Sequence, residues 1–304
     1  MKKFIMMIGA SGSGKSTFAK NWAKQLDGVW LSSDAIRAEL WGDENDQQHP
    51  ETVFRIMNKR LMDALDKDFN VIYDATNLSA KRRRALVSQI RAHYKEVFCE
   101  AVVVVADLDL CVIRRSNPDD RMVPKDVIYR QAASFQCPWF DEGWDNIRVE
   151  LGSPWWHNMM KLSDLRAAAM SMPHDNPHHL DTVGEHCHAV QDFIDQRADN
   201  QLVKELGELH DIGKVLTKKI GTDGIAHYFN HDNMSAYLSM YRCVGDSIKD
   251  FNFIHQAVVI GYHMRDYHWR GNDVGFATWL HSLDSDLIFM LTLLMQADRA
   301  CSID

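Results

Sequence analysis

The sequence predicts an α/β domain, with a parallel sheet covered by helices on both faces, followed by an all-helical domain. The first half alternates short apolar runs with amphipathic, charged segments, which is typical of a parallel sheet. In the second half the apolar residues recur at helical spacing. A chain of 304 residues can bury two separate cores. We therefore expect one domain over residues 1–152 and a second over residues 153–304.

The expected elements follow from these patterns. Strands are predicted at residues 4–8, 29–31, 70–73 and 98–105, with helices between them at residues 17–26, 50–66 and 80–94. Residues 153–179 are expected to be a connection followed by irregular chain. Helices are predicted beyond it at residues 185–197, 201–209, 234–241, 247–259 and 278–300.

Composition narrows the class of protein. Hydrophobic residues make up 46% and charged residues 25%, as in ordinary globular proteins. The net charge of −8 argues against a surface that binds nucleic acid throughout, but it allows a local basic groove. The six cysteines lack zinc-finger spacing, which favours free thiols in a reducing compartment. The first apolar run is too short for a secretion signal or a membrane span, so we expect a cytoplasmic protein without membrane contact.

A glycine-rich segment joins the first expected strand to the first helix. It reads GASGSGKST and fits G-x-x-x-x-G-K-[ST], whose backbone N–H groups cradle phosphates at a helix N-terminus. Lys15 would bridge the β- and γ-phosphates, and the Ser16 hydroxyl would reach Mg²⁺. The predicted site for ATP and Mg²⁺ consists of Gly9, Ser11, Gly12, Ser13, Gly14, Lys15, Ser16 and Thr17.

Polar residues follow the next two strands. Asp34, after residues 29–31, could take the proton of an attacking hydroxyl, and Arg37 could hold an acceptor phosphate. Alternatively, Asp34 only caps a helix that begins at Ala35. The segment DATN at residues 74–77 lies at the same sheet edge. The basic run at residues 81–84 is either a solvated helix face or a substrate contact.

A loop at residues 114–124 carries three arginines, Arg114, Arg115 and Arg121. It is either a plain surface loop or a mobile lid that supplies a cation to the transferring phosphoryl group. Together with GASGSGKST, Ser33-Asp34-x-x-Arg37 and DATN, it resembles the P-loop kinases of the polynucleotide 5′-kinase type, close to the zeta-toxin-like group, over about residues 1–150. The resemblance implies that Asp34 is the general base, that Arg37 contacts the acceptor phosphate and that a lid arginine clamps the donor. Spacing does not choose the lid arginine; Arg115 and Arg121 are carried forward as catalytic candidates.

The second half offers a set of metal-ligand residues in a fixed order. An acidic residue near the end of an apolar helix, such as Asp298, is costly to bury unless it is paired or bound to metal. In His210-Asp211-Ile-Gly-Lys214, the lysine would contact a phosphate. The predicted ligands are His186, His210, Asp211, His231, His263 and Asp298; the other histidines, including His174, remain unassigned.

This set resembles the HD superfamily of metal-dependent phosphohydrolases, and over residues 175–301 it looks closest to the HD domain of bacterial tRNA nucleotidyltransferases. The resemblance implies that His186, His210, Asp211 and Asp298 bind one divalent ion such as Mn²⁺, Ni²⁺ or Co²⁺. It implies that His231 and His263 bind a second ion or the substrate phosphate. Domains of that group act on 2′,3′-cyclic phosphates and phosphates at RNA ends. Lys214 is a candidate catalytic residue.

Both halves together suggest an enzyme that heals broken nucleic-acid ends. A 5′-kinase and a cyclic-phosphate hydrolase would prepare both ends for a ligase, with RNA favoured over DNA. One alternative is a nucleoside or small-molecule kinase fused to a nucleotide phosphohydrolase. Another is a nucleotide-binding switch that governs a hydrolase of a signalling nucleotide. The sequence leaves open the number of metal ions, the oligomeric state and any coupling between the two sites.

Overall fold

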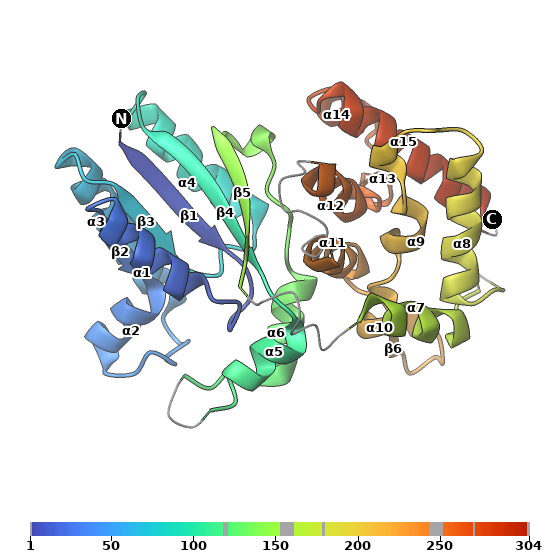
Figure 1. Cartoon of the computed structure of the whole chain (residues 1–304), viewed down its shortest axis with the longest axis horizontal. Coiled ribbons are helices and arrows are strands. Elements are labelled where there is room, and N and C mark those ends of the chain that lie inside the picture. The colour runs from blue at the N-terminus through green and yellow to red at the C-terminus, as the bar shows by residue number, and fades with distance from the viewer. Residues whose placement is uncertain are drawn as a thin grey trace. The chain divides into compact units, whose positions relative to one another are not determined.

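The computed structural model describes residues 2–117, 121–152, 161–177, 180–242, 252–269 and 271–302. The chain divides into two compact units, Met1–Gln131 with Pro138–Met159 and Ala132–Cys137 with Met160–Asp304 (Figure 1). The expected division after residue 152 was a single break, whereas the short segment Ala132–Cys137 belongs to the second unit. There the Phe135 ring lies 5.6 Å from the ring of Tyr237, and Cys137 Sγ lies 3.8 Å from Met240 Sδ.

The first unit contains one parallel sheet. Its strands are β1 (Lys3–Ile8), β2 (Val29–Ser32), β3 (Val71–Asp74), β4 (Phe98–Val105) and β5 (Asn146–Leu151). The strand order is β2-β3-β1-β4-β5, and every pairing is parallel. The predicted α/β class is confirmed for this unit. The sequence prediction missed β5, because its apolar residues alternate with Arg148 and Glu150 instead of forming a continuous run.

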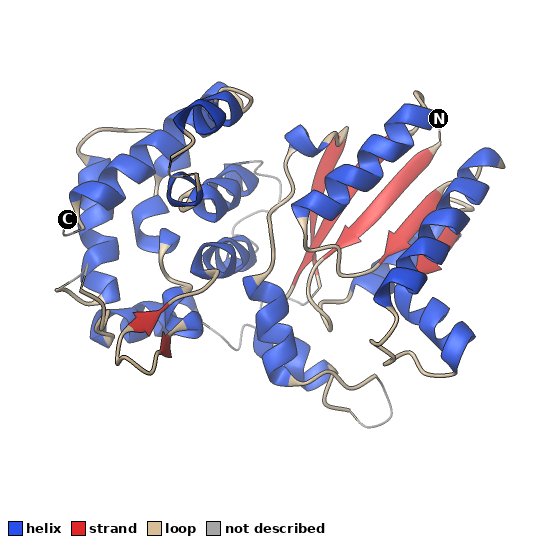
Figure 2. Ribbon diagram, turned by 180° about the vertical axis from the view of Figure 1, so that it is seen from behind, coloured by secondary structure: helices blue, strands red, loops and turns tan. Residues whose placement is uncertain are grey.

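Helices cover both faces of this sheet (Figure 2). The helices of this unit are α1 (Lys15–Gln25), α2 (Ser33–Trp41), α3 (Pro50–Asp66), α4 (Ala80–His93), α5 (Leu108–Arg114) and α6 (Lys125–Ala133), of which α5 and α6 lie beyond the carboxyl ends of the strands (Figure 1). Ile5 and Met7 of β1 pack with Phe18 and Trp22 of α1 on one face. On the other face the Tyr73 hydroxyl donates to Asn58 of α3 at 2.7 Å. The alternation of side chains along the strands thus anchors helices to both sides.

The second unit is mostly helical, as predicted. Its helices are α7 (Leu162–Ser171), α8 (Val183–Asp195), α9 (Leu206–His210), α10 (Lys214–Thr217), α11 (His231–Arg242), α12 (Asn252–Tyr262), α13 (Arg265–His268), α14 (Asp273–Leu280) and α15 (Ser285–Ala300). It is not wholly helical, however. β6 (Lys219–Ile220) and β7 (Ala226–His227) form a short antiparallel hairpin, whose turn uses Gly224 at a φ of 78°.

Two further expectations for the second half are wrong. The predicted helix at residues 278–300 is two helices, because Asp284 caps α15 by accepting a hydrogen bond from the Leu287 backbone N–H at 3.0 Å. The region expected to be irregular contains α7. Part of the helix predicted at residues 247–259 lies outside the described residues, and α12 begins at Asn252.

The cysteines and the helix lengths complete the description. The five cysteines within the described ranges, Cys99, Cys111, Cys137, Cys187 and Cys301, are all free thiols. Among the helices that the structure describes, none has both the length and the apolar character needed to cross a bilayer.

Candidate active sites

The glycine-rich loop between β1 and α1 has a shape that requires glycine. Gly9, Gly12 and Gly14 have φ angles of 148°, 83° and 100°, in the region that side chains other than glycine rarely adopt. A Cβ at Gly9 would lie 2.5 Å from the Val104 carbonyl oxygen, and one at Gly12 would lie 2.6 Å from that of Cys111. The loop therefore forms only with glycine at these positions, in the conformation that directs backbone N–H groups at phosphate.

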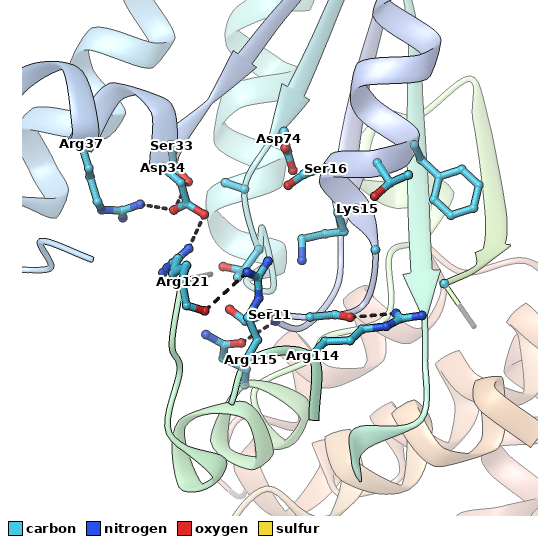
Figure 3. Close-up of a pocket in the computed structure, with 18 of the residues that line it drawn as sticks. Ser11, Lys15, Ser16, Ser33, Asp34, Arg37, Asp74, Arg114, Arg115 and Arg121 are labelled. Atoms are coloured by element: carbon cyan, nitrogen blue, oxygen red, sulfur yellow. Dashed lines mark hydrogen bonds and ion pairs between the residues drawn. The ribbon is translucent and has the colours of Figure 1, made fainter. Parts of the chain in front are cut away.

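A cavity of about 990 Å³ opens at the end of this loop (Figure 3). Six of the eight predicted nucleotide-binding residues line it, namely Ser11, Gly12, Gly14, Lys15, Ser16 and Thr17. Gly9 and Ser13 are not among the described lining residues. Ser13 is fully buried, and its Oγ lies under the loop, 3.1 Å from the position of a Cβ on Gly9. Gly9 and Ser13 therefore contribute to the conformation of the loop and not to the described lining of the cavity.

Lys15 and Ser16 meet an acidic residue that the sequence analysis did not assign to the site. Lys15 Nζ donates to the Ala10 carbonyl at 2.6 Å, and burial lowers the pKa of Lys15 although Asp74 partly opposes this. Asp74, at the end of β3, accepts hydrogen bonds from Ser16 and from Trp30 Nε1, the latter at 3.1 Å. Burial raises the pKa of Asp74. A serine hydroxyl paired with a carboxylate is the arrangement that holds Mg²⁺ in P-loop enzymes.

Asp34 lies across the cavity, in the first turn of α2, and two arginines hold it. Its Oδ1 accepts a hydrogen bond from Arg37 Nη1 at 2.7 Å, and its Oδ2 forms an ion pair with Arg121 (Figure 3). The alternative that Asp34 caps this helix is wrong. The Ser32 side chain caps it by accepting from the Ala35 backbone N–H at 3.3 Å. The Asp34 carboxylate is therefore available to the cavity.

The three arginines predicted in the loop at residues 114–124 take different positions around the cavity that they line. Arg121 reaches Asp34, whereas Arg114 Nη1 donates to the Gly12 carbonyl of the glycine-rich loop at 3.0 Å. Arg115 Nη1 lies 3.5 Å from the Arg121 carbonyl oxygen, at the outer limit of a hydrogen bond. Arg114 therefore lies beside the glycine-rich loop, and Arg121 lies beside Asp34. Arg115 joins the two ends of its loop through its contact with the Arg121 backbone.

The basic run at residues 81–84 divides between the two roles considered for it. Arg82 lines the cavity, as a substrate contact would. Arg83 is buried and forms an ion pair with Glu142 at 2.6 Å, while its Nη1 donates to the carbonyls of Asn77 and Leu78. Arg83 thereby fixes the loop that follows Asp74. Arg84 pairs with Asp141 on the surface.

Gln131 is a further residue that the sequence analysis missed. Its Oε1 accepts a hydrogen bond from the Ser11 backbone N–H at 2.8 Å, and it lines the cavity. A glutamine on an amphipathic helix carries no sequence signal of such a role, because the contact joins residues 120 positions apart.

In the second unit, the six predicted metal ligands converge from separate elements. His186 comes from α8, His210 from α9, His231 from the start of α11 and Asp298 from α15. Asp211 directly follows α9, and His263 directly follows α12. All are buried or, in the case of Asp298, nearly so.

Asp211 is the centre of this cluster. Its Oδ1 lies 3.0 Å from His231 Nε2 and 3.7 Å from His263 Nε2. Its Oδ2 lies 3.4 Å from His210 Nε2 and 3.7 Å from His186 Nε2. Two ligand groups result, His186–His210–Asp211 and Asp211–His231–His263, each with donor atoms within 4.8 Å of one another. Asp298 joins the first group, with Oδ1 3.1 Å from His186 Nε2.

Backbone contacts orient three of the imidazoles. The Nδ1 atoms of His210, His231 and His263 each lie within hydrogen-bond distance of the carbonyl three residues earlier, at 2.7, 2.8 and 2.6 Å. If each Nδ1 donates its proton there, the Nε2 lone pair points into the cluster. This is the way that proteins orient histidines for metal binding.

The cluster fits a cation. His210 Nε2, His231 Nε2 and Asp211 Oδ1 are buried and have no hydrogen-bond partner among the described residues, a costly arrangement without a bound ion. His231 Nε2 and Asp211 Oδ1 are close but lack hydrogen-bond geometry. Burial opposes a charge on His210, but Asp211 and Asp298 outweigh it and raise the pKa of His210 to about 10. The carboxylates thus attract positive charge, which a divalent ion would supply.

Lys214 lies at the edge of this cluster. Its Nζ is 2.5 Å from Asp211 Oδ2 and 3.5 Å from His174 Nε2. Burial lowers the pKa of His174 to about 4, with Lys214 adding to the effect, so this histidine is neutral at pH 7. The sequence analysis left His174 unassigned because nothing near it in the sequence points to Lys214, 40 residues away.

Comparisons with known proteins agree with the geometry of the first unit. Residues 4–138 match the family model described as an AAA domain. With the glycine-rich loop and parallel sheet, this match defines the first unit as a P-loop domain of the kinase type, the class that uses ATP and Mg²⁺. No curated protein matches the chain.

Several solved structures are similar to part of the chain. The structure of the Pnkp1/Rnl/Hen1 complex has 25% identity and a TM-score of 0.32, over 41% of this chain and 42% of that one. The structure of the Pnkp1/Rnl/Hen1 RNA repair complex has 26% identity and a TM-score of 0.39, over 47% and 46%. An unliganded sugar kinase from Janibacter sp. HTCC2649 has 18% identity and a TM-score of 0.39, over 51% and 88%. The match therefore spans less than half of each of the first two chains.

Proposed function

We propose that this protein heals nucleic-acid ends, with RNA the favoured substrate. The first unit transfers the γ-phosphoryl group of ATP to a 5′-hydroxyl. The second unit removes a 2′,3′-cyclic, 2′- or 3′-phosphate. The observation that carries the kinase proposal is the position of Asp34, which shares one cavity with Lys15 and Ser16 and is held by Arg37 and Arg121.

In the kinase reaction each charged side chain has a distinct task. Lys15 binds the β- and γ-phosphates, and Ser16 with Asp74 holds the Mg²⁺ that neutralises their charge. Asp34 accepts the proton of the attacking hydroxyl. Arg37 binds the phosphate next to that hydroxyl, and Arg121 stabilises the charge that builds on the transferring group.

In the hydrolase reaction the chain's task is to position the substrate and hold charge. His186, His210, Asp211 and Asp298 hold one divalent ion, and His231 and His263 hold a second ion or the phosphate. A divalent ion bound there lowers the pKa of a bound water and polarises a phosphoryl oxygen. Lys214 contacts the phosphate from its position beside Asp211. The convergence of these side chains on Asp211 is the observation that carries this half of the proposal.

The two activities suit one substrate. Many ribonucleases leave a 2′,3′-cyclic phosphate on one end and a 5′-hydroxyl on the other, whereas a ligase needs a 3′-hydroxyl and a 5′-phosphate. A chain with both activities prepares both ends, and a ligase would act after it.

The test uses the full chain and one short RNA with a 5′-hydroxyl and a 2′,3′-cyclic phosphate. It is incubated with ATP and Mg²⁺, Mn²⁺, Ni²⁺ or Co²⁺, and both ends are read by mass spectrometry. Wild type should add a phosphate at the 5′ end and remove the one at the 3′ end. Lys15→Ala should lose only the first activity, and Asp211→Ala only the second.

Two results would contradict the proposal. If the RNA ends stay unchanged while free nucleosides, sugars or nucleotides are consumed, the chain acts on small molecules. If Lys15→Ala removes both activities, the first unit regulates the second. The same assay with a DNA of equal sequence tests the preference for RNA.

A further inference from the structure

A second cavity lies in the second unit, outside the histidine cluster. It has a volume of about 310 Å³, and Asp266, Trp269, Gly271, Asp273, Phe276 and Arg299 line it. These residues come from α13, α14, the turn between them and the end of α15 (Figure 1). The volume is at the lower end of the range for pockets that hold small ligands.

The cavity adjoins two of the proposed metal ligands through the chain itself. Arg299 directly follows Asp298, and Asp266 is three residues after His263. Three residues span at most about 11 Å. The Cα atoms of Asp266 and His263 are therefore no more than about 11 Å apart, and on this basis we expect one nucleotide to extend from the histidine cluster to the cavity.

Among the described residues that line the cavity, Arg299 is the one cation, and it is paired with Asp266. Asp266 forms an ion pair with Arg299 through Oδ2, and its Oδ1 accepts a hydrogen bond from the Tyr267 backbone N–H at 2.7 Å. This pair has no net charge. Asn272, rather than Asp273, caps α14 by accepting from the Gly275 N–H at 3.1 Å, so the Asp273 carboxylate is not used for capping. Within the described lining, the Asp273 carboxylate is thus the charge left outside the ion pair, and it favours a group that carries N–H donors.

The aromatic rings suit a flat ligand. Trp269 is stacked on Trp279, with ring centroids 6.5 Å apart and ring planes 25° apart. A Cβ on Gly275 would lie 2.5 Å from the Trp269 ring, so the glycine lets this ring lie directly against α14. Trp269 is thus held in place, and with Phe276 it offers a stacking surface.

We infer that this cavity binds the nucleobase of the terminal nucleotide whose phosphate lies at the histidine cluster. The inference rests on the proposed phosphohydrolase activity and adds a recognition site to it. Trp269 and Phe276 stack on the base. Asp273 accepts a hydrogen bond from an exocyclic amino group, as acidic side chains do with cytosine. Guanine, adenine and cytosine carry such a group and uracil does not.

The test compares short RNAs that end in a 2′,3′-cyclic phosphate and differ in the terminal base, together with one whose terminal nucleotide is abasic. The Mn²⁺-loaded full chain should hydrolyse the amino-bearing ends faster than the abasic one. Stacking is worth about 1–3 kcal/mol per base, so Trp269→Ala should lower kcat/KM on these ends by roughly tenfold and leave the abasic end unchanged. Asp273→Asn should remove the preference over uracil. Val274→Ala, 81% exposed on the same helix, is the matched control.

Binding is measured separately from hydrolysis. Equilibrium dialysis with guanosine 3′-monophosphate should show about tenfold weaker binding by Trp269→Ala than by wild type. If wild type hydrolyses RNA ends and both variants behave like wild type, the base site is wrong and the proposed function stands. If no end is hydrolysed but Trp269→Ala alone loses the nucleotide, the base site stands and the proposed reaction fails. Equal losses on base-bearing and abasic ends would overturn the base site, because they indicate a general structural effect.

Discussion

At each candidate site, neighbouring cationic side chains hold one aspartate carboxylate in position. Asp34 is paired with Arg37 and Arg121, and Asp211 is paired with Lys214 and surrounded by imidazoles. Burial opposes the charge on Asp211, but Lys214 and the surrounding imidazoles outweigh it and hold the pKa of Asp211 well below its usual range. Asp211 is therefore ionised, which is the form that a metal ligand requires.

Asp34→Asn tests the proposed general base. The amide cannot take the proton of the attacking hydroxyl, so the rate of phosphoryl transfer should fall by about 10²- to 10⁴-fold. ATP binding should persist, because Asp34 does not contact the glycine-rich loop in the described structure. The rate is measured with a 5′-hydroxyl RNA and binding by titration calorimetry. A variant that keeps more than a tenth of the wild-type rate would show that another group is the base.

Asp211→Asn tests the proposed metal centre. The carboxylate faces both ligand groups, so its loss should weaken binding of Mn²⁺ at every position of the cluster. Orienting partners of metal ligands are already worth about 10–100-fold in affinity, and a shared ligand should exceed that. Metal content after dialysis is measured by mass spectrometry. Asp192→Asn, an exposed residue of α8, is the control, and equal metal content in both variants would refute the assignment.

The positions of these residues depend on the helices and strands that carry them. The sequence predicted those elements that have a local sequence signal. The glycine-rich loop and the buried strands have such signals. The start of α15 was missed although Asp284 stands in a mostly polar stretch, HSLDSD at residues 281–286, and aspartate is a preferred N-cap residue. β5 lies at the sheet edge and carries charged residues on its exposed side.

The residues of the candidate sites were likewise predictable only where a pattern in the sequence marks them. The convergence of the six predicted ligand residues could be predicted because their order resembles a known pattern. For Asp74 the sequence placed the DATN segment at the sheet edge but did not reveal its pairing with Ser16. Gln131 and His174 could not be predicted, because their roles depend on Ser11 and Lys214, which the fold brings near from distant parts of the chain. Such partners carry no signal in a single sequence.

Thr182→Ala tests how α8 is held at its start. Thr182 and Glu185 form a reciprocal capping box, with the Glu185 N–H donating to Thr182 Oγ1 at 3.2 Å and Glu185 accepting from the Thr182 N–H at 2.9 Å. Loss of this cap should lower the free energy of unfolding by about 1 kcal/mol. Urea denaturation monitored by circular dichroism measures it. Ser163→Ala, exposed in α7, should change stability much less; equal effects would contradict the role of the cap.

At the scale of the whole molecule, each ligand should stabilise its own unit. A ligand that binds only the folded form adds about 2.7 kcal/mol of stability at 100 times its dissociation constant. Mg²⁺ with ATP should therefore raise the unfolding temperature of the first unit, and Mn²⁺ that of the second. Scanning calorimetry of wild type, Lys15→Ala and Asp211→Asn measures these shifts. If Mn²⁺ still raises the unfolding temperature in Asp211→Asn by as much as in wild type, the cation binds elsewhere.

The path of the chain at Ala132–Cys137 also limits how the protein can be divided. A fragment that stops at residue 152 keeps Phe135 and Cys137, but it lacks Tyr237 and Met240, which pack against them. The complementary fragment keeps Tyr237 and Met240 but lacks Phe135 and Cys137. Separately expressed halves would thus each display an apolar surface that normally has a partner, and they would be prone to aggregate. Inactivating point substitutions in the intact chain are the sound way to assign either activity.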